Sequence, residues 1–260
     1  GFSVYSCKEV FMYFYGMDYS YLVFVMPAVL LSFLAQFFVK SSFSRFSKIK
    51  SVRNMTGAQA AQLLLRKNNI SDVKIAHISG SLTDNYNSST KILSLSDSTY
   101  ASTSIAAIGV AAHETGHAIQ HATGYGPLAF RTILVPVANI GSSFGPLLAI
   151  LGYLLGSFGT EQAQGVLPAY HGLFQLITDI GLLMFAAAVL FYIVTLPVEF
   201  DASLRAIKIL REENILDEDE LSGVKKVLSA AALTYVASAL TAIGSLVRFF
   251  VLTNRRNGRR

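Results

Sequence analysis

The sequence has little cysteine, no tryptophan and few charged side chains. One cysteine, Cys7, stands in the 260 residues, so an intramolecular disulfide is excluded. Charged residues make up 14% of the chain and hydrophobic residues 52%, whereas a soluble domain carries about 25% charged residues. A large share of the surface is therefore expected to face lipid rather than water.

The net charge of +5 comes without zinc-finger spacing and without a platform of aromatic and basic side chains. Nucleic acid is therefore not expected as a partner. We interpret the basic excess as a topology signal and as contact with the anionic lipids of a bilayer.

Long apolar segments predict a multi-pass membrane protein, because a helical span needs about 20 apolar residues. Transmembrane segments are expected at 19–39, 127–157 and 173–198, and the last region, 227–260, holds an apolar helix and a basic tail. The segment 127–157 contains several prolines, so it is either one kinked span or a broken segment shielded by protein. The remaining regions are expected to face water: an N-terminal extension (1–18), a module (40–126), an outer loop (158–172) and a charged segment (199–226).

The basic residues that follow the first span set the expected orientation. Five of them occur with no acidic residue among them: Lys40, Arg45, Lys48, Lys50 and Arg53. The positive-inside rule then places 40–126 and 199–226 in the cytoplasm. A complete fourth span would put the basic tail outside, against the rule. Either the fourth segment does not span the membrane, or one of the other three segments does not cross it in the way assumed.

The module 40–126 is expected to be a small α+β unit. Thr56 and Gln59 form a capping-box pattern before an apolar stripe, which predicts a helix ending near Asn68. The alternating segments 73–78 and 90–95 predict two strands in an antiparallel hairpin, and a helix is expected to begin near Thr103. The fold class predicted is a mainly α membrane protein with about four apolar helices and a zincin-like cytoplasmic module.

The motif with the clearest chemistry is H-E-x-x-H, formed by His113, Glu114 and His117. Residues four apart share one face of a helix, so both imidazoles can bind one zinc ion. Glu114 can then act as the general base that takes a proton from the attacking water. The alternative, two surface histidines beside a glutamate, does not explain three polar groups on an apolar helix.

A third zinc ligand must come from elsewhere in the chain. His121 lies about 12 Å along a helix from His113, so a capping or outer role suits it better than ligation. Glu199 is the first candidate and Asp201 the second, because both follow the third span. The alternative is that they cap a helix running from Phe200 to Glu213.

Other polar residues have less specific interpretations. Arg205 and Tyr235 could stabilise an oxyanion, but an ion pair and helix packing are the simpler roles. His77 is expected at a strand edge or surface, His171 in the outer loop away from the zinc, and Asp84 as a turn cap.

At these motifs the chain resembles the YugP-like family of neutral membrane zinc metallopeptidases. The stretches that carry the resemblance span almost the whole chain and include NMTGAQAAQLLL, LTDNYN, AAHETGHAIQHATGY, TLPVEFDASLRA and VLSAAALTYVAS. The resemblance implies a bacterial inner-membrane protein with Zn²⁺ on His113 and His117. The similar gluzincins of the HtpX type take a downstream glutamate as third ligand, which favours Glu199. The chain departs from the family in one stretch, where the family has LTDHYD and this chain has LTDNYN, so Asn85 and Asn87 replace a histidine and an aspartate.

These observations predict a zinc-dependent endopeptidase with a peptide or membrane-protein substrate near the cytoplasmic face. A non-catalytic membrane partner holding structural zinc is the second hypothesis, although a structural site needs no base and is usually closed by four ligands. A transporter is the third, with few spans to support it. The oligomeric state does not follow from the sequence.

Overall fold

The computed structural model describes residues 19–158 and 171–254. The expected N-terminal extension, most of the expected outer loop and the basic tail lie outside these residues. The described chain divides into two compact units. The first unit takes its residues from 1–32, 131–193 and 237–260, and the second comprises 33–130 and 194–236.

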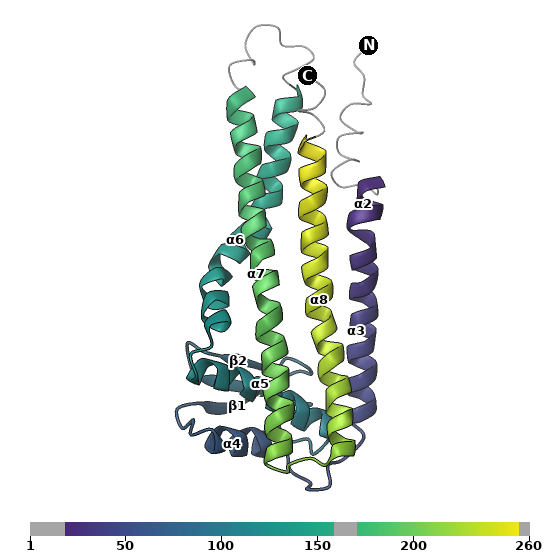
Figure 1. Cartoon of the computed structure of the whole chain (residues 1–260), viewed down its shortest axis with the longest axis vertical. Helices are drawn as coiled ribbons and strands as arrows, with labels where there is room; N and C mark the ends of the chain where they lie inside the picture. The colour runs from purple at the N-terminus through teal and green to yellow at the C-terminus, as the bar shows by residue number, and fades with distance from the viewer. Residues whose placement is uncertain (1–18, 159–170, 255–260) are drawn as a thin grey trace. The chain divides into compact units, whose positions relative to one another are not determined.

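The first unit is helical (Figure 1). It contains α2 (Tyr19–Phe24), the start of α3 (Met26–Phe46), α6 (Gly126–Phe158) from residue 131 onward, and parts of α7 (His171–Glu212) and α8 (Glu218–Asn254). Its core joins α6, α7 and α8 through small and large apolar side chains: Ala138, Ile150, Phe185, Ala188, Val189, Ala242, Phe249 and Leu252.

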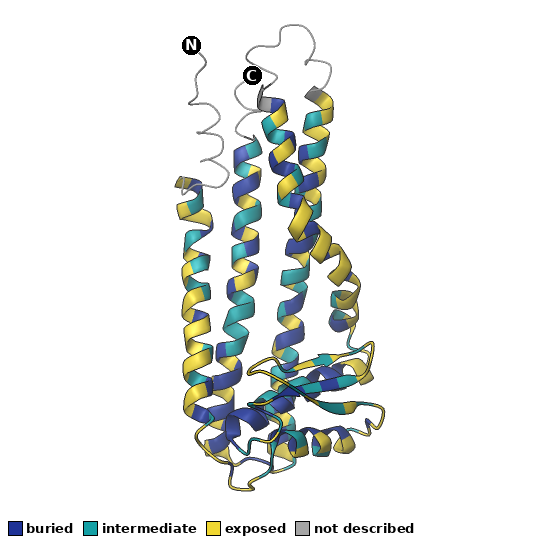
Figure 2. Ribbon diagram, turned by 180° about the vertical axis from the view of Figure 1, so that it is seen from behind, coloured by how far each residue is buried: buried dark blue, intermediate teal, exposed yellow. Residues whose placement is uncertain are grey.

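Four helices of the described chain are long and apolar enough to cross a membrane. They are Met26–Phe46, Gly126–Gly156, Gly172–Glu212 and Glu218–Thr253. Large apolar side chains such as Phe33, Ile133 and Leu183 are exposed on them, which suits a lipid environment. Figure 2 shows exposed positions along these helices. The helix α6 continues through Pro136 and Pro146, so the segment 127–157 is helical throughout. The expectation of a mainly α membrane protein is confirmed.

The second unit places a helix and a three-stranded sheet around α5 (Ile105–Ala122). The helix α4 (Gly57–Lys67) begins at the predicted capping box, where Thr56 Oγ1 accepts from Gln59 N and Gln59 Oε1 accepts from Thr56 N. The sheet consists of β1 (Lys74–Ile78), β2 (Asn85–Asn87) and β3 (Ile92–Ser96) in the order β1-β3-β2.

The predicted pairing of 73–78 with 90–95 as an antiparallel hairpin is wrong. These strands, β1 and β3, run parallel, with Lys74 opposite Ile92. The connection between them contains β2, which pairs antiparallel with β3 and forms the hairpin of the sheet. A tight turn closes that hairpin, because Asn87 Oδ1 accepts from Ser89 N and Thr90 N. Alternation identifies a strand but not its direction, and the connection is long enough to carry the chain back.

The helix α7 is unbroken from His171 to Glu212 and passes through Pro197. Glu199 and Asp201 therefore do not cap a helix starting at Phe200, as the alternative interpretation supposed. The next helix begins with a reciprocal cap, in which Asp217 Oδ1 accepts from Glu220 N and Glu220 Oε2 accepts from Asp217 N.

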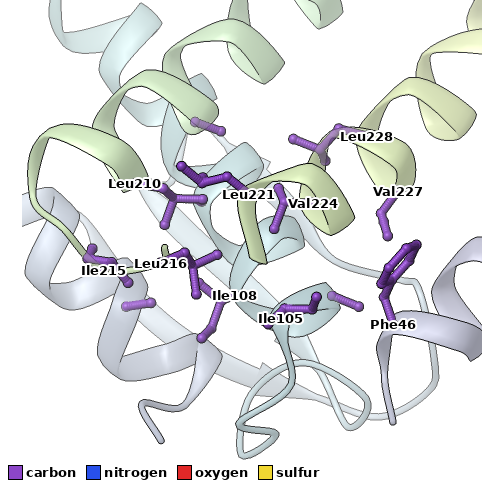
Figure 3. Close-up of a cluster of buried hydrophobic side chains, with 14 of the residues drawn as sticks. Phe46, Ile105, Ile108, Leu210, Ile215, Leu216, Leu221, Val224, Val227 and Leu228 are labelled. Atoms are coloured by element: carbon purple, nitrogen blue, oxygen red, sulfur yellow. The ribbon is translucent and has the colours of Figure 1, made fainter. Parts of the chain in front are cut away.

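An apolar core fastens α5 to the ends of α3, α7 and α8 within the second unit (Figure 3). Ile105 and Ile108 of α5 meet Leu210 of α7 and Leu221 and Val224 of α8, and all five are almost fully buried. On its other side α5 packs against the sheet, where Ala111 contacts the cluster around Leu93 and Leu95. The motif helix is thus held rigidly between a sheet and two long helices.

Candidate metal centre

The two histidines of the motif lie on a helix with little freedom to move. Ser104 caps α5 by accepting a hydrogen bond from Ala107 N, and most residues of the helix are buried. The spacing of four places His113 and His117 on one face, with ring centroids 4.8 Å apart. Burial of the helix therefore fixes both imidazoles without help from a ligand.

Gly116, one of the two variable positions of the motif, allows α7 to approach this face. A Cβ atom at Gly116 would lie 2.6 Å from the carbonyl oxygen of Ala202, closer than real Cβ atoms come to a backbone oxygen. The residues of α7 on either side of this contact, Glu199 and Ser203, can therefore reach His113. The close crossing of α5 and α7 therefore brings Glu199 to His113, although the two residues are 86 positions apart in the sequence.

His113, His117 and Glu199 converge on one point. Oε2 of Glu199 lies 3.2 Å from Nε2 of His113 and 3.4 Å from Nε2 of His117. All three donor atoms lie within 4.8 Å of one another. Ligand atoms at zinc distances in a tetrahedron are about 3.3–3.6 Å apart, so the spacing around Glu199 fits a zinc ion.

The outer nitrogen of each imidazole has its own partner. Nδ1 of His113 lies 3.1 Å from Ser203 Oγ, and Nδ1 of His117 lies 3.0 Å from Gln120 Oε1. The Gln120 amide group donates to Val198 O and Asp201 Oδ2, so its oxygen must accept from the Nδ1–H of His117. That tautomer leaves Nε2 with a free lone pair, as metal ligation requires.

Sequence reasoning missed the roles of Gln120 and Ser203. Gln120 is fully buried on an apolar helix three residues after His117, and a buried amide needs partners. A glutamine at an apolar position of this helix is the signal in the sequence that could have indicated the role of Gln120. Ser203 carries no comparable signal, because its role depends on the rotation of α7 about its axis.

Two carboxylates interact electrostatically with the imidazoles in this centre. Glu199 is 2% exposed, and Glu114 is half-buried on α5. Burial raises the pKa of the Glu114 carboxyl, with Glu199 and Asp84 adding to the rise against the two histidines. Burial lowers the pKa of His117, but the hydrogen bond to Glu199 and the charge of Glu114 outweigh it, so the net shift is upward. Two carboxylates close together in a buried site are costly unless a cation compensates them.

The other candidate ligands lie outside this group. Asp201 accepts from Gln120 and forms an ion pair with Arg205 at 2.5 Å, so it contacts the centre only through Gln120. His121 turns to the sheet, where its Nδ1 lies 2.9 Å from the Tyr86 hydroxyl of β2.

The remaining polar residues have local contacts. The Arg205 guanidinium also lies over the Tyr125 ring, which supports the simpler interpretation of this residue. Tyr235 lies half-buried on α8. His77 pairs with Asp97 at the surface, 2.7 Å away. The side chain of His171 lies outside the described part of the chain.

The segment that departs from the family pattern is held by short-range hydrogen bonds. Asp84 accepts from both the backbone and the hydroxyl of Ser96, which fixes the start of β2. Asn85 donates to Thr83 O, and Asn87 closes the turn of the hairpin. The two asparagines thus have structural contacts of their own.

The fold and this centre define a class: membrane proteins whose H-E-x-x-H helix meets a glutamate from a later helix. The chain belongs to the family described as "Putative neutral zinc metallopeptidase", whose model matches residues 21–254. It is similar to the "Putative membrane protease YugP" of Bacillus subtilis (strain 168), with 43% identity over 222 residues that cover 85% of this chain and 91% of that protein. No solved structure matches the chain. The resemblance seen in the sequence is confirmed, and zinc is the metal of the family.

Proposed function

We propose that the chain is a zinc-dependent endopeptidase that cuts membrane-associated proteins. One observation carries the proposal: His113, His117 and Glu199 converge, with Glu114 beside them on the same helix. Three protein ligands leave a coordination position open, as in catalytic zinc sites, whereas structural sites are closed by four ligands. The centre lies in a unit that contains one end of each of the four candidate membrane spans, which favours substrates in or at the bilayer.

The proposed mechanism divides the work between the ligands and Glu114. Zinc on the three ligands would polarise a peptide carbonyl and lower the pKa of a water. Glu114 takes a proton from the attacking water as its oxygen bonds to the carbonyl carbon. The same carboxyl returns the proton to the amide nitrogen as the C–N bond breaks. Ser203 and Gln120 hold the imidazoles in the orientation that this requires.

An extended substrate would lie along the outer edge of β2. This strand is at one edge of the sheet and contacts α5 through Tyr86 and His121. Its free backbone groups can pair with a peptide strand. Substrate held there would pass over the helix that carries Glu114.

Removing the metal tests the function directly. We expect a chelator to abolish cleavage of unfolded or membrane-anchored protein substrates by the purified full chain. Stoichiometric zinc should restore cleavage, because the imidazoles stay oriented by Gln120 and Ser203 without it. Cleavage that persists in the metal-free protein, with zinc content checked by atomic emission, would contradict the proposal.

The second unit is proposed to face the cytoplasm of the bacterial inner membrane. Support comes from the basic residues of α3 and the turn after it, including Lys40, Arg45 and Lys48. Val52 is 81% exposed in that turn, so a Val52→Cys reporter in a Cys7→Ser background tests the orientation. A membrane-impermeant maleimide should label it only after spheroplasts are permeabilised. Labelling of intact spheroplasts would reverse the assignment.

A further inference from the structure

The sheet has a second free edge, β1, on the side away from β2. The strand β1 pairs with β3 from Lys74 opposite Ile92 to Ile78 opposite Ser96, and Lys74 N donates to Lys91 O. In a parallel ladder the alternate residues direct their backbone groups the other way, so Ile75 and His77 present N–H and C=O outward. Among the described residues, no hydrogen bond outside the sheet involves these backbone groups.

A groove of about 880 Å³ lies between this edge and α4. Its floor is apolar, with Leu65, Ile70 and Ile75 among its lining residues. Gln62 and Arg66 line the wall formed by α4 and are exposed. The groove therefore offers a strand edge and an apolar floor on one side, and polar side chains on the other.

The charge of the groove is of one sign. Arg66 and Lys74 line it together with no aspartate or glutamate. Neither cation has an ion-pair partner among the described residues, unlike the neighbouring Lys67 and Lys91, which pair with Glu213 and Asp72. An occupant with carboxylates would complement both free cations.

We propose that this groove is a docking site for an extended acidic peptide segment, which adds to the sheet as a strand beside β1. Backbone pairing supplies affinity, and alternate side chains supply specificity. Apolar side chains of the peptide would lie on Leu65 and Ile70, and acidic ones would reach Arg66 and Lys74. The site is separate from the metal centre and does not depend on peptidase activity.

The experiment uses the full chain with Glu114→Gln, in nanodiscs of neutral phosphatidylcholine, and measures fluorescence anisotropy. The probe is a labelled short peptide of alternating valine and glutamate, and its partner has lysine in place of glutamate. The acidic peptide should bind more tightly, with and without zinc. Arg66→Glu with Lys74→Glu should weaken its binding at least about tenfold and favour the lysine peptide.

Two controls test whether peptide binding depends only on the net charge of the protein, and whether it depends on backbone pairing with the sheet. Lys225→Glu with Lys226→Glu changes the net charge equally at exposed positions of α8 outside the groove, and should leave the preference unchanged. N-methylation of alternate peptide residues removes the donors facing β1 without altering the protein, and should abolish binding.

Several outcomes overturn the proposal. The first is that the Lys225 and Lys226 changes weaken binding as much as the Arg66 and Lys74 changes do, and the second is that the N-methylated peptide binds fully. The third is that binding is lost when zinc is removed, because that result assigns the peptide to the metal centre. A further one is that the Arg66 and Lys74 changes weaken association with phosphatidylglycerol vesicles but not with the peptide. That result would assign both cations to lipid headgroups.

Discussion

Replacing Glu114 with glutamine should abolish peptide hydrolysis and leave zinc binding intact. Glutamine has almost the same shape as glutamate but cannot accept a proton and return it. General acid–base groups contribute about 10²–10⁴-fold to rate, so kcat should fall by that order. Glu114 is not a member of the ligand group, so the zinc content of the variant should equal that of the wild type. Steady-state cleavage and metal analysis on the same preparation measure both quantities.

The matched control is Glu212→Gln, at the exposed end of α7. It makes the same chemical change away from the centre and should cleave as the wild type does. If Glu114→Gln cleaves equally well, the base is another group and the proposed mechanism fails. If neither the variant nor the wild type cleaves any substrate while both hold zinc, the non-catalytic hypothesis is the better one.

The parts of this molecule that sequence predicts well are those encoded locally. A charge-free run of about 20 residues specifies a span by itself, and all four apolar regions are helical in the structure. The H-E-x-x-H spacing likewise fixes two imidazoles on one face before any tertiary contact forms. Helix geometry alone was enough to separate His121 from His113, and the structure places His121 against Tyr86 instead.

The parts that sequence did not predict depend on how distant elements meet. Alternation marked β1 and β3 as strands, but their parallel pairing depends on the path of the connection through β2. The charged segment after the expected span 173–198 indicated a boundary near Glu199, yet α7 continues past it. The contacts of Gln120 and Ser203 require a particular rotation of α7 against α5, which Gly116 permits and no local pattern encodes.

A second prediction follows from the position of Glu199. Glu199→Gln keeps the volume of the side chain but replaces an anionic ligand with a weak neutral one. Zinc affinity should fall by more than the roughly 10–100-fold typical of losing an outer hydrogen-bond partner. Cleavage should disappear with the metal. Competition with a zinc-chelating dye measures the affinity.

The same dye competition compares Glu199→Gln with variants of three other residues near the ligands. Gln120→Leu removes the hydrogen-bond partner of His117 and should lower zinc affinity by about 10–100-fold. Asp201→Asn changes a partner of Gln120 and not of an imidazole, so its effect should be smaller. His121→Ala should leave the affinity unchanged, because its ring contacts Tyr86. A larger loss for Asp201→Asn than for Glu199→Gln would make Asp201 the ligand.

Thermal unfolding separates a lost ligand from a damaged fold. A metal that binds only the folded state stabilises it by RT ln(1 + [L]/Kd), so zinc should raise the Tm of the wild type by an amount that grows with the logarithm of its affinity. In Glu199→Gln this zinc-dependent rise should vanish. The metal-free variant should unfold close to the metal-free wild type, because the glutamine amide can hydrogen-bond the two imidazoles in place of the Glu199 carboxylate. A metal-free Tm well below that of the wild type would mean that Glu199 supports the fold rather than the metal.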